Sequence, residues 1–212
     1  ELAEALPNYG VIGRTRERSS AEGEANPIFF DRAKWALVES RTGTFWLSET
    51  PSVPGSKSWR SSLPRIATWG VFRERLGEQR ILVLNTHWDH QSQEAREQSA
   101  AVIAEFLGQE AGDLPVIVMG DFNVGPANPA RERLTEGFAG SPPLVDTFAV
   151  LHPGVERNTG TYHGFRGHAS GPRIDAILAS HAFTVLGAEI DRRGSVEAPL
   201  SDHYPVVAEL RL

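Results

Sequence analysis

The sequence of 212 residues contains no cysteine. Disulfide bonds and thiolate metal sites are therefore excluded, and any metal ion must be bound through oxygen or imidazole nitrogen. A run of roughly 20 apolar residues, which a membrane-spanning helix requires, is also missing, and we recognise no signal peptide. The sequence is thus typical of a soluble protein, cytoplasmic or secreted, and nothing in it specifies an oligomeric state.

Basic residues are fewer than acidic residues. Lysine and arginine number 21 against 27 aspartate and glutamate residues, which gives a formal net charge of -6. This balance argues against a broad polycationic surface for nucleic acid, although it allows a local basic groove. The remaining composition, with 40 % hydrophobic and 23 % charged residues, is that of an ordinary globular protein, so we expect one domain over residues 1–212.

Short apolar runs bounded by glycine, proline or charged residues predict mostly strands. Two pairs of runs are separated by short polar segments and are predicted as hairpins, namely 27–30 with 35–38 and 65–72 with 80–84. Single strands are predicted at residues 9–13, 114–119, 173–178, 183–190 and 206–210. The segment 142–171 is rich in glycine and polar residues and is predicted to be a loop.

Two helices are predicted from capping residues and a period near 3.6. Ser92 caps the first, which we expect to end at Gly108. Asn128 and Pro129 suit the cap and first position of the second, which runs to about Glu136. Because strands outnumber helices and the helices cannot cover both faces of every sheet, we predict an α+β fold of two packed sheets with helices outside.

The segment Gly120-Asp121-Phe122-Asn123 follows the apolar run 114–119, which is predicted to be a buried strand. Gly120 permits a sharp exit from that strand. An extended backbone would then direct Asp121 and Asn123 to the same side, so that a carboxylate and an amide meet at the strand end. The alternative is an Asx turn that only closes the strand.

Polar side chains stand at the ends of three other predicted strands. Asn85 and His87 close one, Asp175 begins another, and Asp202 with His203 precedes the last. A carboxylate among apolar residues is costly to bury without a partner, and His203 would provide one for Asp175. Singly, each residue has a structural explanation as a solvated strand end or a turn. Together, without a thiol or a serine elbow, they point to metal-assisted hydrolysis.

These residues also carry a family resemblance. The segments Gly120-Asp121-Phe122-Asn123, Arg173-Ile174-Asp175 and Ser201-Asp202-His203, in this order and at about this spacing, resemble the endonuclease/exonuclease/phosphatase superfamily, which includes deoxyribonuclease I and exonuclease III. Asn85-Thr86-His87 fits the same pattern. The resemblance runs from about Gly23 to the C-terminus, and the set of three motifs is highly specific. It implies a four-layer α/β/β/α sandwich of two packed mixed sheets.

The resemblance implies divalent-metal-dependent hydrolysis of a phosphoester by in-line attack of water. By this resemblance His203 is the general base and Asp175 holds its ring. Asp121 and Asn123 position water, metal and phosphate, and both are candidate metal ligands together with Asp202. The implied ion is Mg²⁺ or Mn²⁺, because oxygen ligands suit a hard dication.

A second histidine is implied to take part in the reaction. His87 matches a residue of the deoxyribonuclease I branch that contacts the scissile phosphate and acts as an acid toward the leaving oxygen. Its carboxylate partner there precedes an apolar strand, and Glu24 occupies the matching place. Arg65, Asn85 and His163 complete the set as candidate substrate-binding residues.

One motif of the family is missing. The family pattern begins with a strand ending in Asn, followed by a Gln-Glu pair whose Glu is a principal metal ligand, and no residue from Glu1 to Glu4 matches them. Residues 1–7 instead look like the end of an amphipathic helix stopped by Pro7. We therefore expect this domain to lack its N-terminal strand and first metal ligand, which would weaken Mg²⁺ binding.

Three functions remain open. The first is a phosphoesterase acting on a small or lipid-derived phosphoester, which the net charge of -6 favours slightly. The second is an endonuclease or exonuclease acting on DNA or RNA. The third, from another class, is a binding module that keeps the fold and has lost catalysis. Residues 44–51 and 161–165 resemble bacterial members of unassigned substrate.

Overall fold

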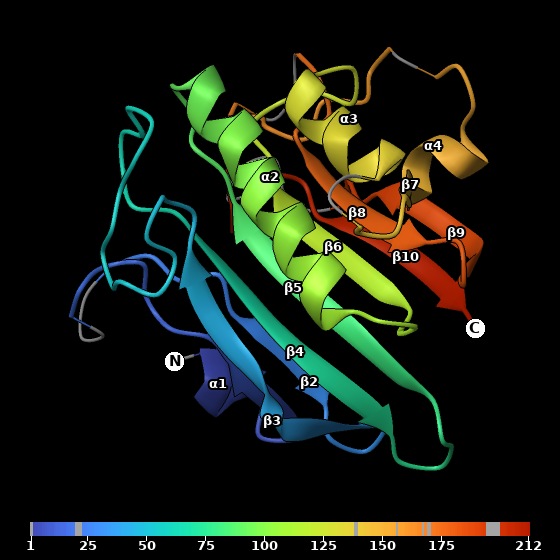
Figure 1. Cartoon of the computed structure of the whole chain (residues 1–212). Helices are drawn as coiled ribbons and strands as arrows, with labels where there is room; N and C mark the ends of the chain where they lie inside the picture. Colours follow the sequence, from blue (N-terminus) through green and yellow to red (C-terminus); the bar gives the residue numbers. More distant parts are fainter. Residues whose placement is uncertain are drawn as a thin grey trace.

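The structure is a computed structural model that describes residues 2–19, 23–137, 140–155, 157–166, 168, 171–193 and 200–212. It has a mixed α+β fold built on a six-stranded sheet with the strand order β3-β4-β5-β6-β8-β7 (Figure 1). These strands are β3 (Trp35–Trp46), β4 (Ile66–Glu74), β5 (Arg80–His87), β6 (Val116–Asp121), β7 (Leu144–Asp146) and β8 (Asp175–Ser180). Strands β5 and β6 are parallel, and β6 and β8 are antiparallel.

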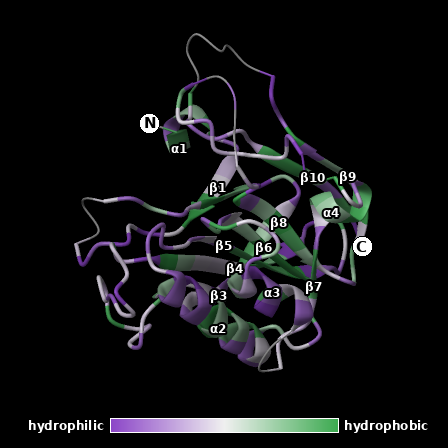
Figure 2. Ribbon diagram, turned by 90° about the horizontal axis from the view of Figure 1, so that it is seen from above, coloured by the Kyte–Doolittle hydropathy of each residue, from purple (hydrophilic) through white to green (hydrophobic). Residues whose placement is uncertain are grey.

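Helices and smaller sheets lie on opposite sides of the six-stranded sheet. The helices of one side are α2 (Gln93–Glu110) and α3 (Pro129–Glu136). Two antiparallel ribbons lie on the other side, β1 (Tyr9–Ile12) with β2 (Ile28–Asp31) and β9 (Thr184–Ile190) with β10 (Val206–Arg211), as Figure 2 shows.

Two short helices complete the fold. The helix α1 (Leu2–Ala5) lies beside β1 on the outer side of the ribbons, and α4 (Thr147–Leu151) lies beside β8 and β9 (Figure 2). The predicted four-layer α+β class is therefore confirmed, with the second sheet present as two separate ribbons. Among the helices in the described residues, none has the length and apolar character needed to cross a membrane.

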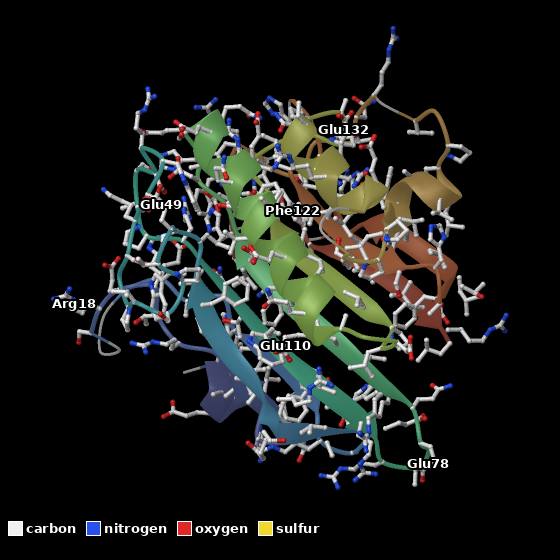
Figure 3. All side chains as sticks on the ribbon, viewed as in Figure 1. Arg18, Glu49, Glu78, Glu110, Phe122 and Glu132 are labelled. Atoms are coloured by element: carbon white, nitrogen blue, oxygen red, sulfur yellow. The ribbon has the colours of Figure 1, made fainter. Side chains whose placement is uncertain are left out.

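The main core lies between the six-stranded sheet and the helices α2 and α3. Leu84, Val118 and Leu178 contribute from three neighbouring strands and pack in one cluster with Ile103 of α2. Phe122, which follows β6, is fully buried in the same cluster (Figure 3). Because this core begins directly behind the end of β6, the polar residues at that strand end stand on a rigid base.

The helix α2 begins as predicted and ends later. The Ser92 hydroxyl accepts a hydrogen bond from the backbone N–H of Ala95 at 3.1 Å, which confirms the cap. The predicted end at Gly108 is wrong, because the helix continues through Glu110. One glycine costs a helix only about 1 kcal/mol relative to alanine, and the buried Leu107 holds the last turn in the core. The helix α3 follows the predicted cap and length.

One of the two predicted hairpins is wrong. Strands β4 and β5 pair as expected, with Phe72 opposite Ile81. Strand β2, however, pairs with β1, and the neighbouring β3 pairs with β4, so the short segment between β2 and β3 connects two different layers. A short polar connection is compatible with either outcome, and the distant partner strands decide between them.

The segment 142–171 contains more structure than predicted. It includes the edge strand β7 and the helix α4, in addition to loop. Both elements are short. The strand β7 pairs with β8, and α4 is capped by Asp146, whose carboxylate accepts hydrogen bonds from the N–H groups of Phe148 and Ala149. Elements of three and five residues carry too little periodicity to be detected in sequence.

The pairing register places three polar residues in one row across the sheet. His87 of β5 is the register partner of Asp121 of β6, and Asp121 is in turn the partner of Asp175 of β8. Paired residues on adjacent strands point to the same face of a sheet. The parallel pair β5–β6 and the antiparallel β8 therefore bring one imidazole and two carboxylates together at the ends of these strands.

Gly120 makes this close approach of strands feasible. Its φ is +142°, and a Cβ atom at this position would lie 1.8 Å from the backbone oxygen of Thr86. We predict that Gly120→Ala lowers the free energy of unfolding by at least about 3 kcal/mol, because steric overlap with the backbone adds to the strain of positive φ. Urea unfolding monitored by circular dichroism measures the loss.

Gly112 provides the matched control. It also has a positive φ, of +54°, but a Cβ atom there would meet nothing within 4 Å. Gly112→Ala should therefore cost only about 1 kcal/mol, which is the strain of an alanine in the left-handed region. Equal losses in the two variants would contradict the steric explanation for Gly120.

Candidate active site

Glu24 and His203 join the row His87, Asp121 and Asp175 into a continuous chain of five side chains, in which Glu24 lies beyond His87 and His203 lies between Asp121 and Asp175. The carboxylate of Asp121 lies between two imidazoles, with Oδ2 3.3 Å from Nε2 of His87 and 4.0 Å from Nε2 of His203. Each imidazole is backed by a second carboxylate through its other nitrogen. Nδ1 of His87 lies 2.7 Å from Oε1 of Glu24, and Nδ1 of His203 lies 2.7 Å from Oδ2 of Asp175.

Different elements supply these side chains. His87 and Asp121 end two parallel strands, and Asp175 begins the antiparallel neighbour. Glu24 comes from the segment before β2, and His203 comes from the segment before β10. The structure therefore brings together all five of these sequence-predicted residues, including the proposed partnership of Glu24 with His87 across 63 positions of sequence.

The electrostatics of Glu24 differ from those of a free surface carboxylate. The hydrogen bond with His87 lowers the pKa of Glu24 from its ordinary value of 4.5 to about 2, and the positive charges of Arg16 and Arg65 act in the same direction. Nη1 of Arg16 lies 2.9 Å from Oε2 of Glu24, and Nη1 of Arg65 lies 3.5 Å from Oε1. Glu24 is therefore held ionised and in a fixed position.

Asp121 has the opposite character. Burial raises its pKa above the ordinary value, and the nearby charge of Asp175 adds to this effect, while the charge of His87 opposes it. The hydrogen bond that Nδ1 of His203 donates to Asp175 raises the pKa of His203 above its ordinary value of 6.5. A partly buried carboxylate that lacks full compensation attracts a cation, which is the condition for a metal ligand or a proton carrier.

Asp121 offers a donor for a divalent cation at the ends of these strands, with two further donor side chains beside it. The ligand atoms of Asp121, Asp175 and His203 lie within 4.8 Å of one another. Carboxylate oxygen and imidazole nitrogen are ligands that Mg²⁺ or Mn²⁺ accepts. Of the predicted ligands that are carboxylates, Asp121 belongs to this group and Asp202 does not.

The backbone at Asn123 differs from the predicted extended form. Its φ is +54°, and its N–H donates to Oδ1 of Asp121 at 2.8 Å, which is the Asx turn of the alternative interpretation. The side-chain amide of Asn123 donates to the backbone oxygen of Trp88 at 2.9 Å. The left-handed backbone thus directs the amide nitrogen toward the end of β5, so the amide is fixed by a backbone carbonyl.

A cavity of about 340 Å³ lies against Asp121, Asp175 and His203. Its remaining walls are formed by backbone and side chains around the ends of β6, β8 and the start of β10. Asn85, a predicted substrate-binding residue, also lines this cavity. Its amide nitrogen donates to the backbone oxygen of Pro27 at 2.9 Å, so the residue is fixed in place at the cavity wall.

The other two predicted substrate-binding residues are buried. Arg65 is 4 % exposed, and its guanidinium faces Glu24 and Nδ1 of His90. His163 is 5 % exposed, and its ring packs 4.5 Å from that of Tyr204. Both side chains are enclosed by their neighbours, and a role in substrate binding stays a prediction for each. Arg65 supports Glu24, and His163 packs the segment around Asp202, whose backbone oxygen accepts its N–H.

Two buried carboxylates escaped the sequence analysis. Asp146 binds the guanidinium groups of Arg131 and Arg173, both of which are buried. Burial lowers the pKa of Arg131 to about 10. Nη1 of Arg131 also donates to the backbone oxygen of Arg173 at 3.0 Å, which fixes the approach to Asp175. The spacing between these residues in sequence gives no signal of their association.

Asp89 is the second of these carboxylates. It accepts hydrogen bonds from the backbone N–H groups of Gln91 and Ser92 and from the hydroxyls of Ser61 and Ser62. It thereby attaches the loop that contains the two serines to the start of α2. The close spacing of Asp89 and Ser92 is a turn signal that the sequence analysis did not use.

Comparison with known proteins identifies the relatives of this chain. The model of the Endonuclease/Exonuclease/phosphatase family matches residues 32–203. A solved endonuclease/exonuclease/phosphatase from Bacteroides vulgatus is 32% identical, with a TM-score of 0.86 over 100% of this chain and 79% of that chain. The mannosyl-6-phosphatase Bt3783 of Bacteroides thetaiotaomicron is 32% identical, with a TM-score of 0.83 over 100% of this chain and 80% of that chain.

More distant structures share the fold. The human Nocturnin catalytic domain is 17% identical, with a TM-score of 0.76 over 100% of this chain and 75% of that chain. At this identity the likeness concerns the architecture alone. A search of curated proteins found no match.

The lowered pKa of Glu24 leads to a prediction about stability. Because this pKa is about 2 in the folded chain against an ordinary 4.5, the contribution of Glu24 is complete above pH 4.5 and is lost as the pH falls toward 2. Glu24→Gln should lower the free energy of unfolding at pH 6 by about 1 kcal/mol, a small value because the pair is partly exposed and screened. Urea unfolding at several pH values measures this difference.

The pH dependence provides the internal control. The curves of Glu24→Gln and of the unaltered protein should converge as the pH falls from 4.5 toward 2, because Glu24 is protonated in the unfolded chain near pH 4.5 but in the folded chain only near pH 2. A difference that stays constant over that interval would mean that packing, and not charge, causes the effect.

Proposed function

Because the chain belongs to the endonuclease/exonuclease/phosphatase family, we propose that it is a divalent-metal-dependent phosphoesterase that hydrolyses its substrate by in-line attack of water. The observation that supports this most strongly is the chain of side chains in which Asp121 is flanked by two imidazole–carboxylate pairs. Such a site has a base and an acid on either side of one anionic position.

We assign the general base to His203. Its Nδ1 is occupied by Asp175 at 2.7 Å, which leaves Nε2 free to accept a proton on the side of Asp121. The carboxylate fixes the ring and stabilises the imidazolium formed when water loses its proton. Asp175 thus acts as an orienting residue, and His203 holds the proton at Nε2.

We assign His87 to the opposite side of the phosphate. Glu24 occupies Nδ1 of His87, so Nε2 faces the position next to Asp121. In its protonated form, His87 would donate to a phosphate oxygen or to the leaving oxygen. Arg16 and Arg65 keep Glu24 ionised, so that it can accept a hydrogen bond from Nδ1 of His87.

The metal ion, Mg²⁺ or Mn²⁺, would be held by Asp121, and we retain Asn123 and Asp202 as further candidate ligands. When bound, a divalent cation supplies charge stabilisation to the phosphoryl oxygens. We keep Asp175 out of the ligand set because its Oδ2 is already engaged by His203. Burial raises the pKa of Asp121, and a cation bound beside its carboxylate would lower that pKa again.

For the substrate, we propose a small or lipid-derived phosphoester ahead of nucleic acid. The net charge of -6 disfavours a long polyanion. The similar Bacteroides thetaiotaomicron protein is a mannosyl-6-phosphatase, and a small phosphate substrate is in keeping with that. The presence of both imidazole–carboxylate pairs argues against a binding module that has lost catalysis.

This assignment predicts the effects of two substitutions. His203→Ala should lower kcat by about 10²- to 10⁴-fold, which is the contribution expected of a general base. Asp175→Asn should cause a comparable loss, and the double variant should be little worse than either single variant, because groups that act as a unit are not additive. Hydrolysis of bis(p-nitrophenyl) phosphate with Mg²⁺ measures these rates.

His181→Ala serves as the control, since His181 is exposed in the turn between β8 and β9. It should retain the activity of the unaltered protein. An activity of His203→Ala within tenfold of the unaltered protein, or fully multiplicative losses in the double variant, would contradict the assignment.

A further inference from the structure

Thr161 is hydrogen-bonded to the backbone of Asp175 and to the backbone of Tyr204, the residue that follows His203. It is fully buried, and its hydroxyl oxygen accepts hydrogen bonds from the backbone N–H groups of Ile174 and Asp175, both at 3.1 Å. Two adjacent backbone donors at the start of β8 are therefore satisfied by one side chain. These contacts fix the backbone from which the Asp175 carboxylate projects.

The backbone of the same residue holds the segment that contains the other half of the pair, His203. The carbonyl oxygen of Thr161 accepts the N–H of Tyr204 at 2.8 Å. The next residue, Tyr162, forms an isolated antiparallel bridge with His203. One short segment thus connects β8 to the start of β10, and these strands lie side by side (Figure 1).

We propose that Thr161 is a positioning residue that sets the distance between His203 and Asp175. The proposal rests on the proposed function, in which that pair accepts the proton from water. Thr161 touches neither the reacting atoms nor the carboxylate itself. It acts by holding the two backbone segments at the separation that allows the contact of 2.7 Å between Nδ1 and Oδ2.

The surrounding contacts explain why this role is local. The carbonyl of Ile174 is held by the N–H of Phe122 at 2.9 Å, and the carbonyl of Arg173 is held by Nη1 of Arg131 at 3.0 Å. The carbonyl side of this segment is therefore anchored in the core without Thr161. Loss of the hydroxyl would leave two buried N–H groups unpaired, so the backbone at Asp175 would move to find partners.

The residue type also fits. Valine has nearly the shape of threonine and cannot accept a hydrogen bond, whereas serine keeps the acceptor. The β-branched side chain of threonine restricts χ1, which keeps the hydroxyl directed at the two donors. Thr161→Val and Thr161→Ser therefore separate the hydrogen bonds from the packing.

Thr147 provides a matched control. It is also a fully buried threonine against β8, and its hydroxyl donates to the backbone oxygen of Ile177 at 2.9 Å, two residues along the strand from Asp175. Thr147→Val removes one buried hydroxyl contact with the same strand. It should lower the melting temperature and leave kcat unchanged.

The test compares hydrolysis of bis(p-nitrophenyl) phosphate with Mg²⁺ by the variants. Thr161→Val should lower kcat by about 10- to 100-fold, as is typical of residues that support a catalytic group, with little change in KM. Thr161→Ser should recover most of that loss. A kcat of Thr161→Val equal to that of Thr147→Val would overturn the proposal.

A second measurement does not depend on activity. In the metal-free protein, the amides of Ile174 and Asp175 should be protected from hydrogen exchange, and the Nδ1 proton of His203 should give a downfield resonance from its bond to Asp175. Both signatures should persist in Thr161→Ser and be lost in Thr161→Val. If Thr161→Val does not fold, the smaller Thr161→Ala carries the same expectation.

The two measurements separate the two claims. If the unaltered protein hydrolyses no phosphoester, the proposed function fails, and the exchange and resonance data still decide the role of Thr161. Retention of the resonance together with protected amides in the valine or alanine variant would refute the positioning role.

Discussion

The pairing register of β5, β6 and β8 is the constraint on which the site depends. It sets His87, Asp121 and Asp175 in one row across the ends of three neighbouring strands of the six-stranded sheet. A shift of the β6 register by one residue would turn Asp121 to the opposite face of the sheet, away from His87 and Asp175. The register is fixed by the apolar core on the helix side of the sheet and by Gly120, which lets β6 pass close to the carbonyl of Thr86.

The same row places the carboxylates of Asp121 and Asp175 close together. Asp121 is held close to Asp175 in a poorly hydrated place, which raises the pKa of Asp121. Glu24 is ionised at neutral pH, and its pKa is lowered by His87. In the proposed function, the two imidazole–carboxylate pairs around Asp121 would transfer protons beside a bound cation. Clusters of titratable side chains with shifted pKa values are typical of functional sites.

The sequence predicted the parts of this site that lie at strand ends, because a polar residue beside an apolar run is visible without knowing the partners. His203 with Asp175 was predicted in this way. The left-handed backbone of Asn123 was not, since an extended strand end and an Asx turn have the same residues. Neither the pairing of β2 with β1 nor the contacts of Thr161 could be predicted, because both depend on partners that are distant in sequence.

The central claim is that this row of residues supports metal-dependent hydrolysis of a phosphoester. The most direct test compares p-nitrophenyl phosphate, bis(p-nitrophenyl) phosphate and supercoiled plasmid, each with Mg²⁺ and with EDTA, at low and high salt. The account predicts turnover of a small phosphoester that requires Mg²⁺ and changes little with salt. Cleavage of plasmid that falls steeply with salt would assign a nuclease instead. Equal rates in EDTA, or no turnover of any substrate, would contradict the account.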